Sequence, residues 1–442
     1  MLILMCVWCE KMKPIIGVVL ALGLSVSADN ETKSQFQRGV EALEQGIYVT
    51  AREVFEPLAE QGVAEAQTNL CGMYLNGQGG PKDVAQAARW CRAAAEQGEP
   101  QGQSNLGYLY RRGAGVAQDA RQAARWCRAA AEQGFGTAQF NLGYLYQTGQ
   151  GVKQDDLQAL HWYRLAADQG VATAMHGIGH IYYLGKGAPR DYAIALDWFR
   201  QAADHGDPMG HTKIGVIYFL GQGVQADRHK AISAFFKGAE GGDPVAMRLL
   251  SKLQLEAASS AHERASAVAW MRKAAQLGER EAQFQLALIL FIGDQAPQDM
   301  ATATQWMEKA ARQGHPEAPY LLGETYFDPS IALYDPAKAR KWYQKAVKLG
   351  NPAAMSKLGH ILENGLGGVR DLPAAYRLYE TSAQQGYAPG QYHLADFYER
   401  GVVVEKSLRQ AQHWYAKAAA HDIAPAREGL ARVTAALKRA ER

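Results

Sequence analysis

Along most of this chain, segments of about 36 residues each contain two consecutive sets of apolar and small residues at helical spacing. In residues 136–170 the two sets are Ala138, Leu142, Gly143 and Tyr146, then Ala159, Trp162, Ala166 and Ala167. Apolar residues three and four positions apart lie on one face of an α-helix. Between the sets, Gly149 and Gly151 can adopt the positive φ that ends a helix, and Asp155 can cap the next one. The segment predicts two antiparallel helices, termed helix A and helix B.

This two-helix pattern recurs every 36 residues. Eight of the nine tryptophans fall on one series with that spacing: Trp90, Trp126, Trp162, Trp198, Trp270, Trp306, Trp342 and Trp414. The skipped terms, Ala234 and Leu378, are each followed by an aromatic residue, which indicates that the bulk has moved by one position to Phe235 and Tyr379. Ten glycines, one at the end of each segment, keep the same spacing. A constant period predicts an all-α fold, an α-α superhelix (solenoid) of antiparallel helix pairs in one elongated domain.

The tryptophans are interpreted as core residues that hold helix A against helix B. On that interpretation Trp162→Ala would cost about 3 to 5 kcal/mol of stability. Helix A carries glycines at one recurrent position: Gly107, Gly143, Gly179, Gly215, Gly323 and Gly359. Glycine inside a helix costs about 1 kcal/mol relative to alanine. We therefore expect helix B to pack directly against the backbone of helix A at these glycines.

The consensus of the segment resembles a known repeat. It reads Leu-Gly-x-x-Tyr-x-x-Gly-x-Gly-Val-x-x-Asp, then Ala-x-x-Trp-Tyr-x-x-Ala-Ala-x-x-Gly. This pattern is similar to the Sel1-like repeat, an α-solenoid family related to the tetratricopeptide repeat, and it recurs in register as ten repeats over residues 63–422. Residues 29–62 resemble one further tetratricopeptide-like helix pair, and residues 423–442 a capping helix. The pattern is weakest at residues 251–264 and 328–335, where we expect softer joints.

The resemblance implies a non-catalytic scaffold that binds another protein or a peptide, with a glycan as a further option. Family roles include assembly of envelope complexes, signalling and host-cell interaction by bacteria. In such solenoids helix A lines the concave face. The predicted partner-binding residues there are Tyr108, Arg111, Phe140, Tyr144, His176, His180, Tyr183, Phe219, Phe284, Phe291, Tyr320, Glu324, Phe327, His360, Glu363 and Tyr392.

These predicted partner-binding residues are here termed the helix-A stripe. An alternative interpretation is that their aromatic rings pack on the next helix A. Exposed rings outside the structural positions favour a groove for a partner. Towards the carboxyl end the stripe becomes acidic, which favours a basic or mixed partner there.

The first residues have the pattern of a secretory signal. Lys11 and Lys13 precede the apolar run 15–24, and small residues follow it. We expect residues 1–28 to be removed, with Met12 as the more natural start. The run is shorter than the roughly 20 apolar residues that span a bilayer, so a permanent anchor is the less favoured alternative. The mature chain is expected to be periplasmic or secreted, without stable membrane insertion; without a signal it would be a cytosolic adaptor.

The expected mature chain keeps three cysteines, Cys71, Cys91 and Cys127. Cys71 stands where the next repeats have a helix-A glycine, and Cys91 lies on helix B of the same repeat. This close approach makes a Cys71–Cys91 disulfide one option. The other, and the favoured one, is that all three are buried small hydrophobic residues.

Charge and motifs narrow the remaining functions. A formal net charge of +3 gives no electrostatic argument for nucleic acid. His176 and His180, spaced i, i+4, could hold a metal with His211, but a surface pair is favoured. The chain has no Gly-x-Ser-x-Gly, His-Glu-x-x-His or phosphate-loop motif, and no serine followed by lysine three positions on. Because these motifs are missing, a β-lactamase-like or penicillin-binding enzyme is the less favoured alternative to a scaffold. We expect a monomer without catalysis, cofactor or metal.

Overall fold

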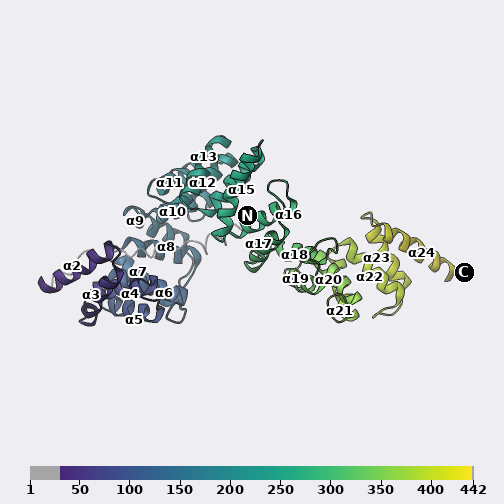
Figure 1. Cartoon of the computed structure of the whole chain (residues 1–442), viewed down its shortest axis with the longest axis horizontal. Coiled ribbons are helices and arrows are strands. Elements are labelled where there is room, and N and C mark those ends of the chain that lie inside the picture. The colour runs from purple at the N-terminus through teal and green to yellow at the C-terminus, as the bar shows by residue number, and fades with distance from the viewer. Residues whose placement is uncertain (1–29, 441–442) are drawn as a thin grey trace. The chain divides into compact units, whose positions relative to one another are not determined.

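The computed structural model describes residues 30–440, which form α-helices and no strand (Figure 1). The predicted signal, residues 1–28, lies outside the described residues. The A helices are α2 (Asn30–Glu44), α4 (Ala64–Asn76), α6 (Pro100–Arg112), α8 (Gly136–Thr148), α10 (Ala172–Leu184), α12 (Pro208–Leu220), α14 (Pro244–Ala257), α16 (Arg280–Ile292), α18 (Ala318–Phe327), α20 (Pro352–Asn364), α22 (Ala388–Arg400) and α24 (Ala424–Ala440). The B helices are α3 (Tyr48–Glu60), α5 (Val84–Glu96), α7 (Ala120–Glu132), α9 (Asp156–Ala167), α11 (Tyr192–Asp204), α13 (Arg228–Glu240), α15 (Ala261–Gln276), α17 (Met300–Arg312), α19 (Pro336–Lys348), α21 (Leu372–Gln384) and α23 (Leu408–Ala419).

The chain divides into two compact units, one ending at Gly242 and the other beginning at Asp243. Within each unit, helix A packs against helix B of the same repeat, and helix B packs against the next helix A. The main contacts of each helix are with its neighbours along the chain, and some A helices also contact the next helix A, as α4 does α6 and α20 does α22. The predicted all-α solenoid with a 36-residue period is confirmed. Within residues 30–440 no helix has both the length and the apolar character needed to cross a bilayer.

The sequence sets the helix ends through caps. Gly149 follows α8 in the left-handed region, with φ of 68°, and stops the helix. Asp155 then accepts hydrogen bonds from the backbone N–H groups of Leu157 and Gln158, both at 3.0 Å, and starts α9. The same glycine and aspartate recur in most repeats, so a constant loop joins helix A to helix B.

The fully buried aromatic residue of a repeat is the one after the tryptophan, which corrects the interpretation of the tryptophan as the core residue. Side chains at this following position are almost wholly inaccessible: Tyr163, Phe199, Tyr343 and Tyr379 at 0% exposure, and Tyr415 at 1%. Among the eight tryptophans of the series, only Trp90 and Trp342 are buried. Cations cover several of the tryptophan rings; the Nζ atoms of Lys309 and Lys345 each lie 3.8 Å from a ring centre.

The buried ring after the tryptophan lies on the bare backbone of helix A, which is why glycine recurs there. A Cβ atom added to Gly143 would come within 2.7 Å of the Tyr163 ring, and one added to Gly179 within 2.8 Å of Phe199. Phe235 occupies this same position in its repeat, against Gly215. The idea that bulk shifts by one residue where tryptophan is missing is therefore wrong: the position is aromatic in most repeats, with or without the tryptophan.

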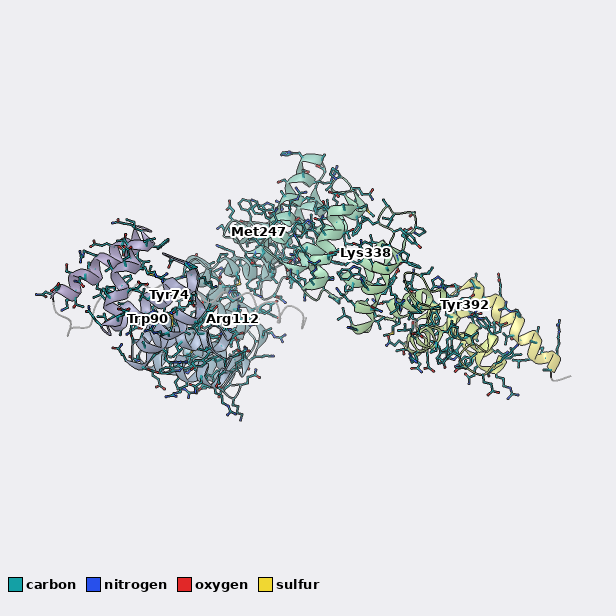
Figure 2. The ribbon with its side chains drawn as sticks, turned by 60° about the horizontal axis from the view of Figure 1, so that its bottom comes forward. Tyr74, Trp90, Arg112, Met247, Lys338 and Tyr392 are labelled. Carbon is teal, nitrogen blue, oxygen red and sulfur yellow. A yellow bond between two sulfur atoms is a disulfide. The ribbon has the colours of Figure 1, made fainter. Side chains whose placement is uncertain are left out.

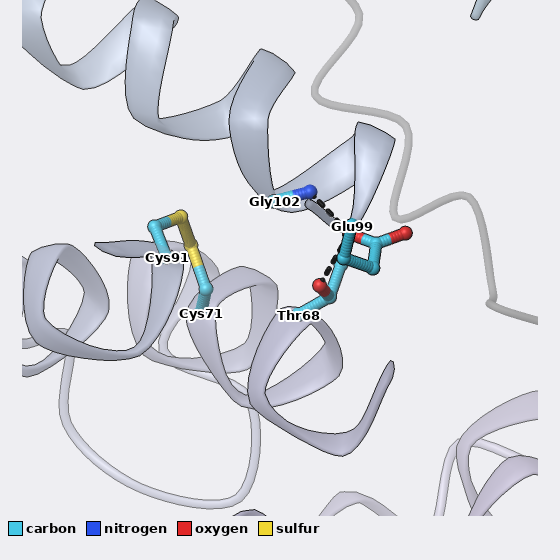
Figure 3. The surroundings of a disulfide bond; sticks show 5 residues. All are labelled: Thr68, Cys71, Cys91, Glu99 and Gly102. Carbon is cyan, nitrogen blue, oxygen red and sulfur yellow. Dashed lines mark hydrogen bonds between the residues drawn. A yellow bond between two sulfur atoms is a disulfide. The ribbon is translucent and has the colours of Figure 1, made fainter. Parts of the chain in front are cut away.

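In the first repeat the same two positions hold a disulfide between Cys71 of α4 and Cys91 of α5, with a Cα–Cα distance of 5.2 Å (Figure 3). Beside it, the Thr68 hydroxyl donates to Glu99 at 2.7 Å (Figure 3). The structure thus differs from the favoured expectation of three free thiols. Cys127 alone is free among the described residues, and burial raises the pKa of its thiol to about 12.

We predict that Tyr163→Ala lowers the free energy of unfolding by about 3 to 5 kcal/mol, because it empties a fully buried site that cannot collapse. Trp162→Ala should cost only about 1 to 2 kcal/mol, because that ring is half-buried. Urea denaturation followed by circular dichroism measures both values. A larger loss for Trp162→Ala than for Tyr163→Ala would restore the tryptophan as the core residue.

The disulfide gives a second prediction. Thiol titration of unfolded, unreduced protein lacking residues 1–28 should find one free thiol, that of Cys127. Cys91→Ser should lower stability by about 3 kcal/mol, because the bond closes a loop of 20 residues in the unfolded chain. Three free thiols in the titration would show that the bond is absent.

Candidate functional site

The structure buries five of the predicted partner-binding residues, so their assignment to an open groove is wrong. Exposure is 1% to 7% for Phe140, Tyr144, His176, His180 and Phe284. The Phe140 ring stacks on Tyr163 at 5.7 Å, and Phe284 stacks on His315 at 3.8 Å. These five side chains pack inside the protein, although not simply on the next helix A: Phe140 stacks on a residue of helix B, and Phe284 on a residue between α17 and α18.

The histidine pair of α10 is part of this packing. His176 Nδ1 lies 2.7 Å from an oxygen of Asp207, and both side chains are buried. Burial, together with Lys213, lowers the pKa of His180 to about 3, so that ring is neutral at physiological pH. His211 is half-buried, and burial lowers its pKa as well. In residues 30–440 no three histidine, cysteine or acidic side chains gather as a metal site would require. The prediction that His176 and His180 form a surface pair is therefore wrong, because both side chains are buried.

Other stripe residues remain partly exposed without forming one continuous site. The Arg111 guanidinium lies between Tyr108 and Tyr144, 5.5 Å from each ring centre. Tyr183 contacts Tyr192 edge to face, and Phe219 is 45% exposed. The remaining members are half-buried in the carboxyl-terminal unit: Phe291, Tyr320, Glu324, Phe327, His360, Glu363 and Tyr392.

Three of these residues, Phe291, Glu324 and Phe327, come together in one cavity of about 500 Å³, here termed the α16–α20 pocket. Leu288 and Phe291 come from α16, Glu324 and Phe327 from α18, and Lys357 from α20. The remaining lining residues are Met300, Met307, Leu321, Thr325, Asp328, Pro329 and Ile331. The lining is thus mainly apolar, and the pocket lies wholly within one unit.

An irregular loop supplies one wall of the pocket. Helix α18 ends early, at Phe327, without the usual glycine, and Asp328 is extended at ψ 112°. The Asp328 carboxylate accepts hydrogen bonds from the Ser330 N–H at 2.9 Å and its hydroxyl at 2.7 Å, which fixes the turn. Pro329 and Ile331 of this loop line the pocket. The sequence pattern identified segment 328–335 as a soft joint and missed that it forms a wall; its apolar residues were the available signal.

One ion pair lies at the pocket. Glu324 accepts a hydrogen bond from Lys357 at 3.1 Å and another from the hydroxyl of Tyr343. Burial and Glu324 raise the pKa of Tyr343, and they raise that of Tyr320 to about 12, so both hydroxyls stay protonated. The carboxylate is therefore already neutralised, and the remaining lining can accept an apolar group.

The acidic residues further along the stripe are neutralised in the same way. Glu363 pairs with Arg400 at 2.6 Å and accepts from the Tyr379 hydroxyl at 3.0 Å. Glu399 pairs with Arg432 at 2.7 Å and accepts from Tyr415 at 2.8 Å. Each carboxylate thus has a cation from the following helix A. Glu363 and Glu399 therefore give little support for a basic partner, because each has a cation of its own chain, although Arg400 is shared between Glu363 and Asp396; the preference for a basic or mixed partner stays a prediction.

Comparison with known proteins identifies the family. Ten consecutive segments match the Sel1 repeat: 64–99, 100–135, 136–171, 172–207, 208–243, 245–279, 280–315, 316–351, 352–387 and 388–422. The chain is 33% identical to c5321, a protective antigen present in uropathogenic Escherichia coli strains and displaying an SLR fold, over 91% of this chain and 87% of that one, with a TM-score of 0.55. A Sel1 repeat protein from Oxalobacter formigenes is 33% identical over 55% of this chain and 96% of that one, with a TM-score of 0.48.

No curated protein matches the sequence. The repeat matches nevertheless cover most of the chain and keep the register of the helix pairs. The predicted family is confirmed: this chain belongs to the Sel1 repeat family.

Proposed function

We propose that this protein is a non-catalytic scaffold outside the cytoplasm that holds a partner protein through the α16–α20 pocket. Sel1 repeat solenoids are generally protein-interaction scaffolds, and their fold is generally non-catalytic. The observation that carries the proposal is an apolar pocket in the helix-A stripe, at a place where the repeat departs from its pattern. Envelope assembly, signalling and host interaction are the roles this would serve.

The volume and the lining of the pocket favour an apolar side chain of a protein over a glycan. A volume of about 500 Å³ lies in the range of ligand pockets in general. Leu288, Phe291, Phe327 and Ile331 provide aliphatic and aromatic contact. The carboxylate of Glu324 is occupied by its ion pair, which leaves few polar groups to receive sugar hydroxyls. A large apolar residue of an extended or helical segment is the occupant that this chemistry fits.

A location outside the cytoplasm has two supports. The sequence of residues 1–28 has the charged, apolar and small-residue regions of a secretory signal. The disulfide between Cys71 and Cys91 is of a kind that persists in oxidising compartments and is rare in the cytosol.

The pocket can be tested with a photo-crosslinking amino acid at Lys357, whose side chain lines it, in the native cell envelope. We predict that a crosslinked partner, once identified and purified, binds Phe291→Ala/Ile331→Ala about tenfold more weakly than the wild type, as for residues in a binding hot spot. Phe219→Ala, an exposed stripe residue of the other unit, is the matched control and should bind normally. Unchanged affinity of the double variant, at unchanged melting temperature, would refute the pocket as the binding site.

Location is tested separately by fractionation and amino-terminal sequencing. We expect the protein in the periplasm or the medium, with a mature terminus after about residue 28. The uncleaved chain recovered in the cytoplasm would contradict this and favour a cytosolic adaptor.

A further inference from the structure

Helix α19 carries a stripe of lysines that the scaffold does not need. Lys338, Lys341, Lys345 and Lys348 follow one another at intervals of three, four and three residues, and α19 has no acidic residue. This spacing places them on one side of the helix over about 15 Å. All four side chains are exposed; Lys338 is labelled in Figure 2.

The lysine stripe borders a hollow. A cavity of about 700 Å³ is lined by the four lysines and by Trp342, Gln344, Val347 and Leu358. Lys338 lies 3.4 Å from Asp335, whereas no carboxylate of the described residues pairs with the other three lysines. The remaining cation of the helix, Arg340, donates to the carbonyl of Val369 at 3.2 Å and is occupied there. The hollow thus combines apolar lining with three ammonium groups that have no carboxylate partner among the described residues; one of them, that of Lys345, lies 3.8 Å from the centre of the Trp342 ring.

Other repeats show that helix B does not require these charges. The position of Lys348 is acidic in every repeat of the amino-terminal unit: Glu96, Glu132, Asp168, Asp204 and Glu240. A cation at the position of Lys345 recurs in several repeats, but only α19 has lysine at all four positions. The stripe is therefore a local feature of one repeat, and the repeat fold forms equally well with the opposite charge at its end.

We propose that this lysine stripe binds an acidic segment of another protein, with an apolar residue of that segment entering the hollow. Lysine ammonium groups are compact charges on flexible stems and can meet carboxylates arranged at helical spacing. Trp342 and Leu358 are 8% and 4% exposed, so half-buried Val347 and the aliphatic stems of the lysines supply most of the apolar contact in the hollow. This lining favours an amphipathic peptide over a uniformly charged polymer. The surface is built on a helix B, shares no lining residue with the α16–α20 pocket and stands whether or not that pocket binds a partner.

The test uses the full mature chain and a labelled synthetic peptide with glutamates at i, i+3, i+7 and i+10 around leucines. A second peptide has glutamine in place of each glutamate. Fluorescence anisotropy at low salt should show binding of the acidic peptide, and affinity should fall steeply with added salt. The glutamine peptide should bind about tenfold more weakly or not at all.

Two matched double variants locate the site. Lys345→Gln/Lys348→Gln removes two charges from α19, and Lys309→Gln/Arg312→Gln removes two charges from the same repeat positions of α17. The α19 variant should bind the acidic peptide about tenfold more weakly, and the α17 variant within about twofold of the wild type. All four residues are exposed. Each variant removes one lysine from a tryptophan ring, and the α17 variant also removes the Arg312–Glu308 pair, contacts worth up to about 1 kcal/mol each at exposed sites, so both variants should stay folded with similar, slightly lowered stability.

Equal weakening by the two variants would overturn the proposal, because it would reflect net charge alone. No binding of the acidic peptide would overturn it as well. Tighter binding of polygalacturonate, or of vesicles containing phosphatidylglycerol, with the same dependence on α19 would show that the occupant is a polysaccharide or a membrane and not a protein. Normal peptide binding by Phe291→Ala/Ile331→Ala would show that the stripe acts independently of the pocket.

Discussion

The contact between the residue after each tryptophan and a small residue of helix A determines how closely the two helices of a repeat approach. Tyr163 on Gly143 and Phe199 on Gly179 leave no room for a Cβ atom. A protein core is packed too densely to absorb a change at only one side of such a contact. In the first repeat, two cysteines occupy both sides and form a disulfide at the same place. The pair is a ring on glycine in several repeats, a disulfide in the first, and a cysteine on glycine at Cys127 and Gly107. The 36-residue period places this contact at the same point of each repeat.

The same contact links the core to the helix-A stripe. Buried tyrosines at this position donate their hydroxyl to a polar residue of helix A: Tyr163 to Gln147 of α8 at 3.0 Å, and Tyr379 to Glu363 of α20 at 3.0 Å. A carboxylate such as that of Glu363 accepts a hydrogen bond from a buried tyrosine and also pairs with a cation of the next helix A. Such satisfied networks rigidify a surface and leave its apolar residues as the groups free to contact a partner. In the carboxyl-terminal unit those apolar residues meet at the α16–α20 pocket.

Periodicity was sufficient to predict the helix pairs, their loops and the family, because glycine stops and aspartate caps act locally. It could not decide which of two adjacent residues is buried. Trp162 and Tyr163 lie about 100° apart on one helix, and their burial depends on how the next helix A is placed. The prediction of the helix-A stripe was only partly right for the same reason: Phe140 and His176 lie on A helices, but their side chains are buried.

The pocket itself was not predictable from the repeat, because it exists only where the repeat fails. The glycine loop of most other repeats is replaced by segment 328–335, whose Pro329 and Ile331 line the cavity. Loops on a rigid scaffold commonly carry function. Departures from a repeat pattern are therefore as informative about binding as the pattern is about fold.

The role of this irregular loop can be measured with a chimera in which residues 328–335 are replaced by the sequence of residues 364–371, the regular loop of the next repeat and of equal length. Isothermal titration with the purified partner gives the affinity. If binding depends on the pocket wall, the chimera keeps its helicity and melting temperature but loses the partner. A chimera that folds and binds with wild-type affinity would show that the departure from the repeat has no part in recognition.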